Sequence, residues 1–182
     1  MNQQITPLTP LRHFQNPVTG HHFDILQDAD STHGALLDME VTYPPQSVEP
    51  PTHYHPFQTE HFTILDGEMS IRINGQLRVY QAGESIEMPP NVHHAMWNSG
   101  HTPTRMHWRI SPALQSEALF YSLATLAGEG KTDQQGKPSL LYAGILFHRF
   151  SREFRLSSPP YVVQKWLFKT LAHAGAWLGL KV

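Results

Sequence analysis

A series of short alternating runs, separated by turn-forming pairs, occupies the middle of the chain. HFTIL ends at Asp66-Gly67 and MSIRI ends at Asn74-Gly75, and both pairs favour tight hairpins. Similar runs lie on either side: HFDIL, GALLDMEVTY, QLRVY, ESIEM, VHHAMWN and TRMHWRI. Strands of about five residues with a turn roughly every ten residues are typical of an antiparallel sandwich or a small barrel. We therefore expect residues 21–112 to form a mainly β domain.

The two flanks of this region differ from it. Residues 1–20 are rich in Pro, Thr, Gln and Asn, which predicts an extended arm. After Pro112 the apolar spacing becomes helical in three stretches: ALQSEALFYSLATLAGEG, SLLYAGILFHRFSREFRL and YVVQKWLFKTLAHAGAWLGL. Residues 113–182 are thus expected to form a helical extension packed on the barrel or on a partner. A chain of 182 residues is long enough for one domain with a substantial core.

The composition excludes several classes of site. The chain has no cysteine, which rules out disulfides, thiolate zinc sites, iron–sulfur clusters and a cysteine nucleophile. It also lacks a Gly-x-Ser-x-Gly elbow, a phosphate-binding loop with lysine and a dinucleotide fingerprint. Histidine is abundant, with 13 residues, and is the commonest metal ligand in proteins.

Charge and hydropathy bear on partners and location. The net charge of −2 gives no reason to expect nucleic acid. Residues 105–182 are more basic than residues 1–104, which suggests either an acidic neighbour or, more simply, a solvated basic face. The N-terminus does not resemble a signal peptide and no apolar run reaches the ~18 residues of a membrane span, so we expect a cytoplasmic protein.

The stretch PPTHYHPFQTEHF concentrates groups that bind metals. Residues two apart on a strand face the same side, so His53 and His55 can share one ion. Glu60 is an odd number of residues from His55, so its convergence requires a break in the strand at 56–59. His94, on a later strand, is the best additional partner. Three imidazoles and one carboxylate suit a single divalent ion such as Fe, Mn, Co, Ni or Zn, and the alternative is a purely structural histidine cluster.

These stretches resemble the two motifs of the cupin superfamily. The first motif comprises His53, His55, Glu60 and Gly67. The second comprises Gly83, Pro89, Asn91, His94 and Asn98. Ser47 and Asn91 stand where glycine is usual, and asparagine tolerates the left-handed backbone better than most residues. The resemblance implies a jelly-roll β-barrel, with His53, His55, Glu60 and His94 as metal ligands. The chain also looks like small single-domain bacterial cupins with a C-terminal helical extension.

Strand parity also indicates what surrounds the metal. Counting by twos from Glu60 and from His94 places Phe62, Ile64 and Met96 on the same side as the ligands, and directs His61 and His93 away from them. On TRMHWRI either the polar or the apolar set of alternate residues faces inward, and burial tendency favours the apolar set. The expected pocket is lined by Phe62, Ile64, Met96, Met106 and Trp108. Such a pocket suits a hydrophobic or aromatic small molecule that chelates the metal through oxygen.

The last helical stretch allows two interpretations. Trp166, Leu167, Leu171, Trp177 and Leu178 most often indicate packing against the barrel or a partner subunit. The less favoured interpretation is a helix at a membrane surface, with lysines near lipid headgroups. The resemblance to cupins, together with an arm that could cover a sheet edge, leads us to expect a homodimer.

Two classes of function remain open. The first is an enzyme in which the metal activates dioxygen or acts as a Lewis acid for isomerisation or hydrolysis, with Glu60 as ligand and possible proton acceptor. Dioxygenase chemistry of the quercetinase type is what the resemblance favours. The alternative is a non-catalytic binding or sensing module in which the metal is structural.

Overall fold

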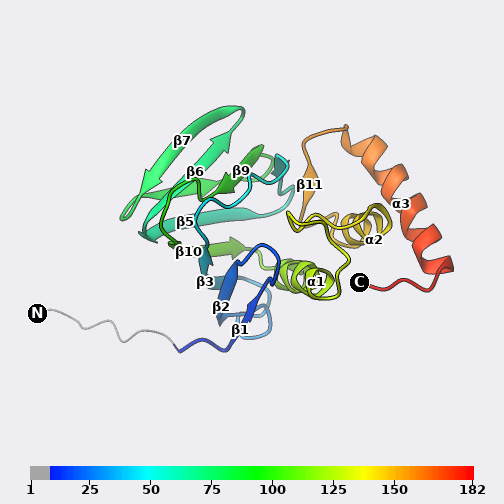
Figure 1. The fold of residues 1–182 in the computed structure, drawn as a ribbon, viewed down its shortest axis with the longest axis horizontal. Helices are drawn as coiled ribbons and strands as arrows, with labels where there is room; N and C mark the ends of the chain where they lie inside the picture. The colour runs from blue at the N-terminus through cyan, green and yellow to red at the C-terminus, as the bar shows by residue number, and fades with distance from the viewer. Residues whose placement is uncertain (1–8) are drawn as a thin grey trace, which may run out of the picture.

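Two antiparallel sheets form the body of the protein in a computed structural model, which describes residues 9–182 (Figure 1). The first sheet has the order β1-β2-β3-β10-β5-β8. Its strands are β1 (Arg12–Gln15), β2 (His22–Gln27), β3 (Leu37–Tyr43), β10 (Thr104–Ser111), β5 (Thr59–Asp66) and β8 (Ser85–Met88). The second sheet has the order β11-β4-β9-β6-β7. Its strands are β11 (Arg155–Leu156), β4 (His53–Tyr54), β9 (His94–Trp97), β6 (Glu68–Ile73) and β7 (Gln76–Gln81). The arrangement is that of a jelly-roll barrel, as expected.

The core lies between the two sheets and follows the alternation of the strands. On β10 the side chains of Met106, Trp108 and Ile110 are buried. The intervening Arg105 and His107 point outward and pair with acidic residues of β3. The apolar face of β10 therefore points into the barrel, which confirms the preferred orientation of this strand.

Tight turns close the β-hairpins where the Gly-containing pairs predicted them. Asn74 and Gly75 both have positive φ, +47° and +86°, between β6 and β7. Gly67 joins β5 to β6 with a φ of +78°, and a Cβ at this position would lie 2.7 Å from the carbonyl oxygen of Pro103. Glycine is thus required at position 67 for two reasons: its φ is positive, and a side chain there would clash with the backbone of Pro103.

Part of the expected N-terminal arm is built into the barrel. Residues Arg12–Gln15 form β1 and pair with β2 of the same chain. The guanidinium of Arg12 also forms an ion pair with Asp28, at 2.8 Å, and another with Glu117 in α1. The first eight residues of the arm lie outside the described residues.

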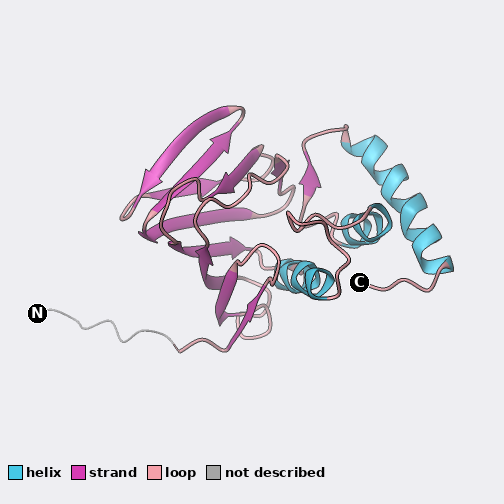
Figure 2. Ribbon diagram, viewed as in Figure 1, coloured by secondary structure: helices cyan, strands magenta, loops and turns pink. Residues whose placement is uncertain are grey.

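The C-terminal extension contains three helices that gather on one side of the barrel (Figure 2). They are α1 (Ser116–Gly128), α2 (Leu140–Arg149) and α3 (Tyr161–Trp177). The prediction of one helix across residues 139–156 is wrong, because α2 ends at Arg149 and residues 155–156 form β11 beside β4. Backbone pairing with the barrel outweighs the helical spacing of that stretch. None of the helices in residues 9–182 has the length and apolar character needed to cross a bilayer.

Candidate metal centre

The four predicted ligands come from both sheets of the barrel. His53 lies in β4 directly opposite His94 of β9, and His55 follows the end of β4. The chain then leaves the second sheet and enters the first at Thr59, so Glu60 approaches from the facing sheet. The required break at 56–59 is present at residues 55–58, which belong to no strand. This crossing resets the strand parity and lets Glu60 face the histidines.

The ligand atoms converge on one point. One ring nitrogen from each of His53, His55 and His94 lies within 4.8 Å of the others. The Oε2 atom of Glu60 lies 3.2 Å from Nε2 of His55 and 3.1 Å from Nε2 of His94. Neither carboxylate oxygen of Glu60 makes a well-aligned hydrogen bond within residues 9–182, nor does Nε2 of His55. Buried polar atoms without partners are unfavourable, and a shared cation would satisfy all of them.

Backbone carbonyls fix the orientation of all three imidazoles. The Nδ1 atoms of His53, His55 and His94 lie 3.0, 2.5 and 3.0 Å from the carbonyl oxygens of Pro51, Glu153 and Val92, respectively. A carbonyl oxygen only accepts, so each Nδ1 carries the proton and each Nε2 keeps its lone pair. Metal-binding histidines characteristically use their second nitrogen in this way. The donor set therefore fits a divalent ion held by three imidazole nitrogens and one carboxylate.

The charges in the cluster favour an ionised Glu60. Its side chain is fully buried, and burial opposes ionisation, but the nearby His55 and His94 outweigh burial and lower the pKa of Glu60 to about 2. Burial likewise lowers the pKa of His53 and of His55. Burial acts in the same sense on His94, but the adjacent Glu60 carboxylate prevails and raises the pKa of His94. A carboxylate among buried imidazoles is suited to a divalent cation.

A segment from the C-terminal extension covers the site. The ring of Phe154 stacks on His53 with 4.6 Å between centroids, and lies edge-on to His55 at 6.2 Å. The neighbouring Glu153 supplies the carbonyl that holds His55, and Leu156 pairs with His53 in the sheet. Sequence reasoning missed Glu153 and Phe154, because their stretch has helical spacing and their partners are about a hundred residues away.

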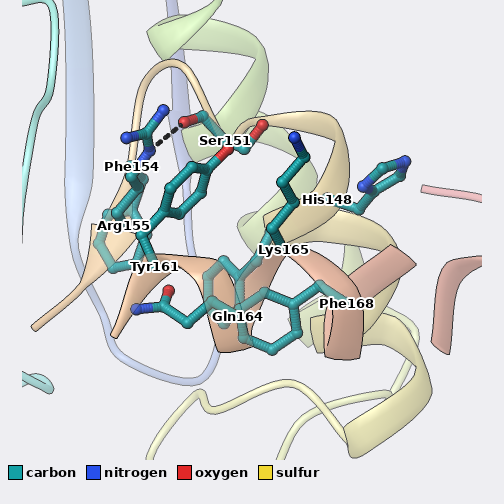
Figure 3. A pocket seen from close by; sticks show the side chains of 9 residues that line it. His148, Ser151, Phe154, Arg155, Tyr161, Gln164, Lys165 and Phe168 are labelled. Carbon is teal, nitrogen blue, oxygen red and sulfur yellow. Dashed lines mark hydrogen bonds between the residues drawn. The ribbon is translucent and has the colours of Figure 1, made fainter. Parts of the chain in front are cut away.

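The cover segment borders a small cavity on its outer side. The cavity has a volume of about 80 Å³ and lies between α2, β11 and α3 (Figure 3). The Arg155 guanidinium lies 3.5 Å from the centre of the Tyr161 ring, and its Nε donates to the carbonyl of Ser151 at 2.9 Å. Gln164 is buried beneath and binds the backbone of Leu156 through both atoms of its amide. These contacts attach the start of α3 to the segment over the metal ligands.

The other residues singled out in the sequence take the orientations that strand parity predicts. Five side chains are buried in the barrel: Phe62, Ile64, Met96, Met106 and Trp108. Phe62 packs on Trp108 with 5.4 Å between centroids. The His93 ring turns away from the ligands, stacks on Tyr54 and bonds to Ser157. His61 points outward and accepts from Arg109 at 3.1 Å.

One residue of the second motif departs from the usual cupin pattern and has a left-handed backbone conformation. Asn91 stands at the position where cupins usually carry glycine, and its φ is +66°. Its N–H donates to the carbonyl of His55 at 3.0 Å. Asparagine thus adopts the left-handed conformation that the turn requires, and the turn in return fixes the backbone of a ligand.

Comparisons with known proteins agree with this geometry. A model of the cupin domain family matches residues 39–110. The tetracenomycin polyketide synthase protein TcmJ of Streptomyces glaucescens is 30% identical over 82 residues, 45% of this chain and 53% of that protein. The probable oxidoreductase yanE of Aspergillus niger is 40% identical over 53 residues, 28% of this chain and 20% of that protein. The chain therefore spans about half, or less, of the length of the curated relatives it matches.

Solved structures resemble the barrel as well. An RmlC-like cupin from Shewanella frigidimarina superposes with a TM-score of 0.47 and 20% sequence identity, covering 57% of this chain and 86% of that chain. The family match spans most of the strands that carry the ligands and both histidine motifs. Residues 39–110 of the chain are therefore a cupin domain.

Proposed function

We propose that the protein is a mononuclear metal-dependent oxidoreductase of the dioxygenase type, acting on a small oxygen-bearing aromatic or apolar molecule. The observation that carries this proposal is the set of three clustered imidazoles with Nδ1 fixed by carbonyls, of which His55 and His94 approach Glu60 through Nε2. The name of one relative, a probable oxidoreductase, supports the reaction class. Isomerisation at the same centre is the variant in which the metal serves only as a Lewis acid.

The chain's own residues would position the metal and shield it from water. A divalent ion at this site would supply a Lewis-acid or redox centre for an oxygen-bearing substrate. Glu60 contributes the one negative charge, so the four-ligand set leaves a net positive centre that attracts an anionic or enolic oxygen. The buried Phe62 and Trp108 give the barrel interior an apolar character, which favours a flat apolar or aromatic substrate.

A second candidate is a binding module in which the metal is structural. Phe154 stacks directly on His53, and the side chains of His55, Glu60 and His94 are buried. A site closed in this way is typical of structural metals, whereas a catalytic metal keeps a position open.

The first test is metal analysis of the purified protein with matched variants. We expect close to one divalent ion per wild-type chain, the same content in His61→Gln, and loss of the ion in Glu60→Gln. Loss of an outer hydrogen-bond partner costs roughly 10–100-fold in metal affinity, and loss of a ligand costs more. Equal metal content in Glu60→Gln and His61→Gln would remove the basis of the proposal.

The second test separates catalysis from a structural role. The metal-loaded protein is screened for oxygen uptake with catechols, flavonols and diketones. Substrate-dependent uptake that is lost in Glu60→Gln and retained in His61→Gln supports the enzyme. A tightly held zinc ion, with no uptake and no spectral response to any of the compounds, supports the structural alternative instead.

A further inference from the structure

Helix α3 carries several large apolar side chains that are exposed in the described chain. Trp177, Val162 and Trp166 are 87%, 69% and 64% exposed, and Val163, Leu167 and Leu178 are also exposed. The sequence favours packing of the two tryptophans and two of these leucines against the barrel or a partner subunit. All four are exposed in the described chain, so they do not pack against the barrel. Figure 1 shows α3 at the outer side of the molecule, beyond α2. At 100° per residue, these six side chains lie within a sector of roughly 160°, which also contains the exposed polar residues Thr170 and His173.

The opposite face of α3 accounts for its attachment to the protein. Phe168 packs against Phe147 of α2 with 5.3 Å between ring centroids. Gly144 of α2 allows the close approach of Leu171, since a Cβ at 144 would lie 2.3 Å from the Leu171 Cβ. The packing face is therefore complete without the exposed tryptophans, and folding of the chain does not explain them.

The charges beside this face are all positive. Lys165 and Lys169 lie along one edge of the apolar sector, and Lys181 follows the end of the helix. Neither α3 nor the residues after it include an Asp or a Glu. A second copy docked through this face would bring like charges together without a partner. An anionic surface would complement them.

We propose that the exposed face of α3 docks on a bilayer surface that carries anionic phospholipids. The apolar side chains would enter the boundary between headgroups and acyl chains, where tryptophan is favoured. The lysines would lie beside the lipid phosphates, because amphipathic helices at membrane surfaces combine apolar burial with attraction to anionic lipid. The helix would lie in the plane of the surface, about 25 Å long for its 17 residues.

The test is flotation of the full-length protein with vesicles of phosphatidylcholine and phosphatidylglycerol in equal parts, against vesicles of phosphatidylcholine alone. We expect binding to the anionic vesicles that weakens as salt is added. Trp97 and Trp108 are buried, so a blue shift of tryptophan emission on binding would report Trp166 and Trp177. Replacing the last two together by Ser should lower the partition coefficient about 100-fold.

Two further variants make the result specific. Lys165→Gln combined with Lys169→Gln should lower binding to anionic vesicles about 30-fold. Leu77→Ser, which removes a half-exposed apolar side chain from β7, should leave binding unchanged. Absence of binding to anionic vesicles at low salt overturns the proposal, and so does equal binding by wild type and the double Trp variant. A wild-type dimer that the double Trp variant converts to a monomer would assign the face to a second copy instead.

Discussion

Removing the Phe154 ring should both destabilise the protein and expose the metal ligands. The ring stacks on His53 at 4.6 Å and on Phe147 at 5.2 Å, and lies edge-on to His55 at 6.2 Å. Through His53 and His55, the Phe154 side chain connects the helical extension to two of the ligands. Phe154→Ala therefore removes the cover and leaves all four ligands in place.

The magnitude follows from burial and from the aromatic contacts. A fully buried Phe contributes about 1.5–3 kcal/mol by transfer from water, and Phe154 is only partly buried. Each well-placed aromatic pair adds about 0.5–1.5 kcal/mol. We expect the free energy of unfolding to fall by about 2–4 kcal/mol, which for a chain of this size lowers Tm by roughly 4–15 °C.

The assay combines thermal unfolding, followed by circular dichroism, with the rate at which a chelator removes the metal. Leu77→Ala is the control, because Leu77 is exposed and lies in β7, away from the ligands. We expect Phe154→Ala to speed metal release and Leu77→Ala to leave the release rate unchanged. If Phe154→Ala matched wild type in both Tm and release rate, the assignment of this ring as the cover of the site would be wrong.

Two further perturbations test parts of the barrel away from the metal. His21 packs on Tyr43, and burial lowers its pKa to about 4. In the unfolded chain His21 binds a proton near pH 6.5, whereas in the folded chain it does so only near pH 4. The free energy of unfolding therefore falls by about 2–3 kcal/mol as the pH drops from about 6.5 to 4. Urea unfolding across this range should show the loss in wild type and in His13→Gln, and a flatter profile in His21→Phe. An unchanged profile in His21→Phe would contradict this. Gly67→Ala should cost about 1–3 kcal/mol more than Gly75→Ala, because both have positive φ but only position 67 faces a carbonyl at 2.7 Å. Equal urea midpoints for the two glycine variants would rule out the steric part of the reasoning.

Local patterns predicted an antiparallel sandwich or small barrel, and the resemblance to cupins specified the jelly roll and the four ligands. Alternation along the strands fixes which side chains face inward, so Glu60, Phe62 and Ile64 all prove to be buried while His61 points outward. The need for a break after His55 also follows from parity alone. These features depend on neighbours in sequence, which is why they can be read without a structure.

Features that depend on distant partners could not be read in this way. The stretch containing Glu153 and Phe154 continues the helical spacing of α2, and nothing local marks its pairing with β4. Helix α3 presents apolar residues on two faces, and sequence does not tell which face packs on α2. The structure decides that Phe168 and Leu171 pack, and that Trp166 and Trp177 do not.

The contact between His55 and Glu153 joins residues 98 positions apart. During synthesis the ribosome releases His53, His55, Glu60 and His94 long before the carbonyl that orients His55. Contacts of such long sequence separation form late in folding. The nascent barrel therefore lacks the carbonyl that orients His55 until the chain has been made to residue 153, so an ion bound before then would meet an incompletely ordered set of ligands.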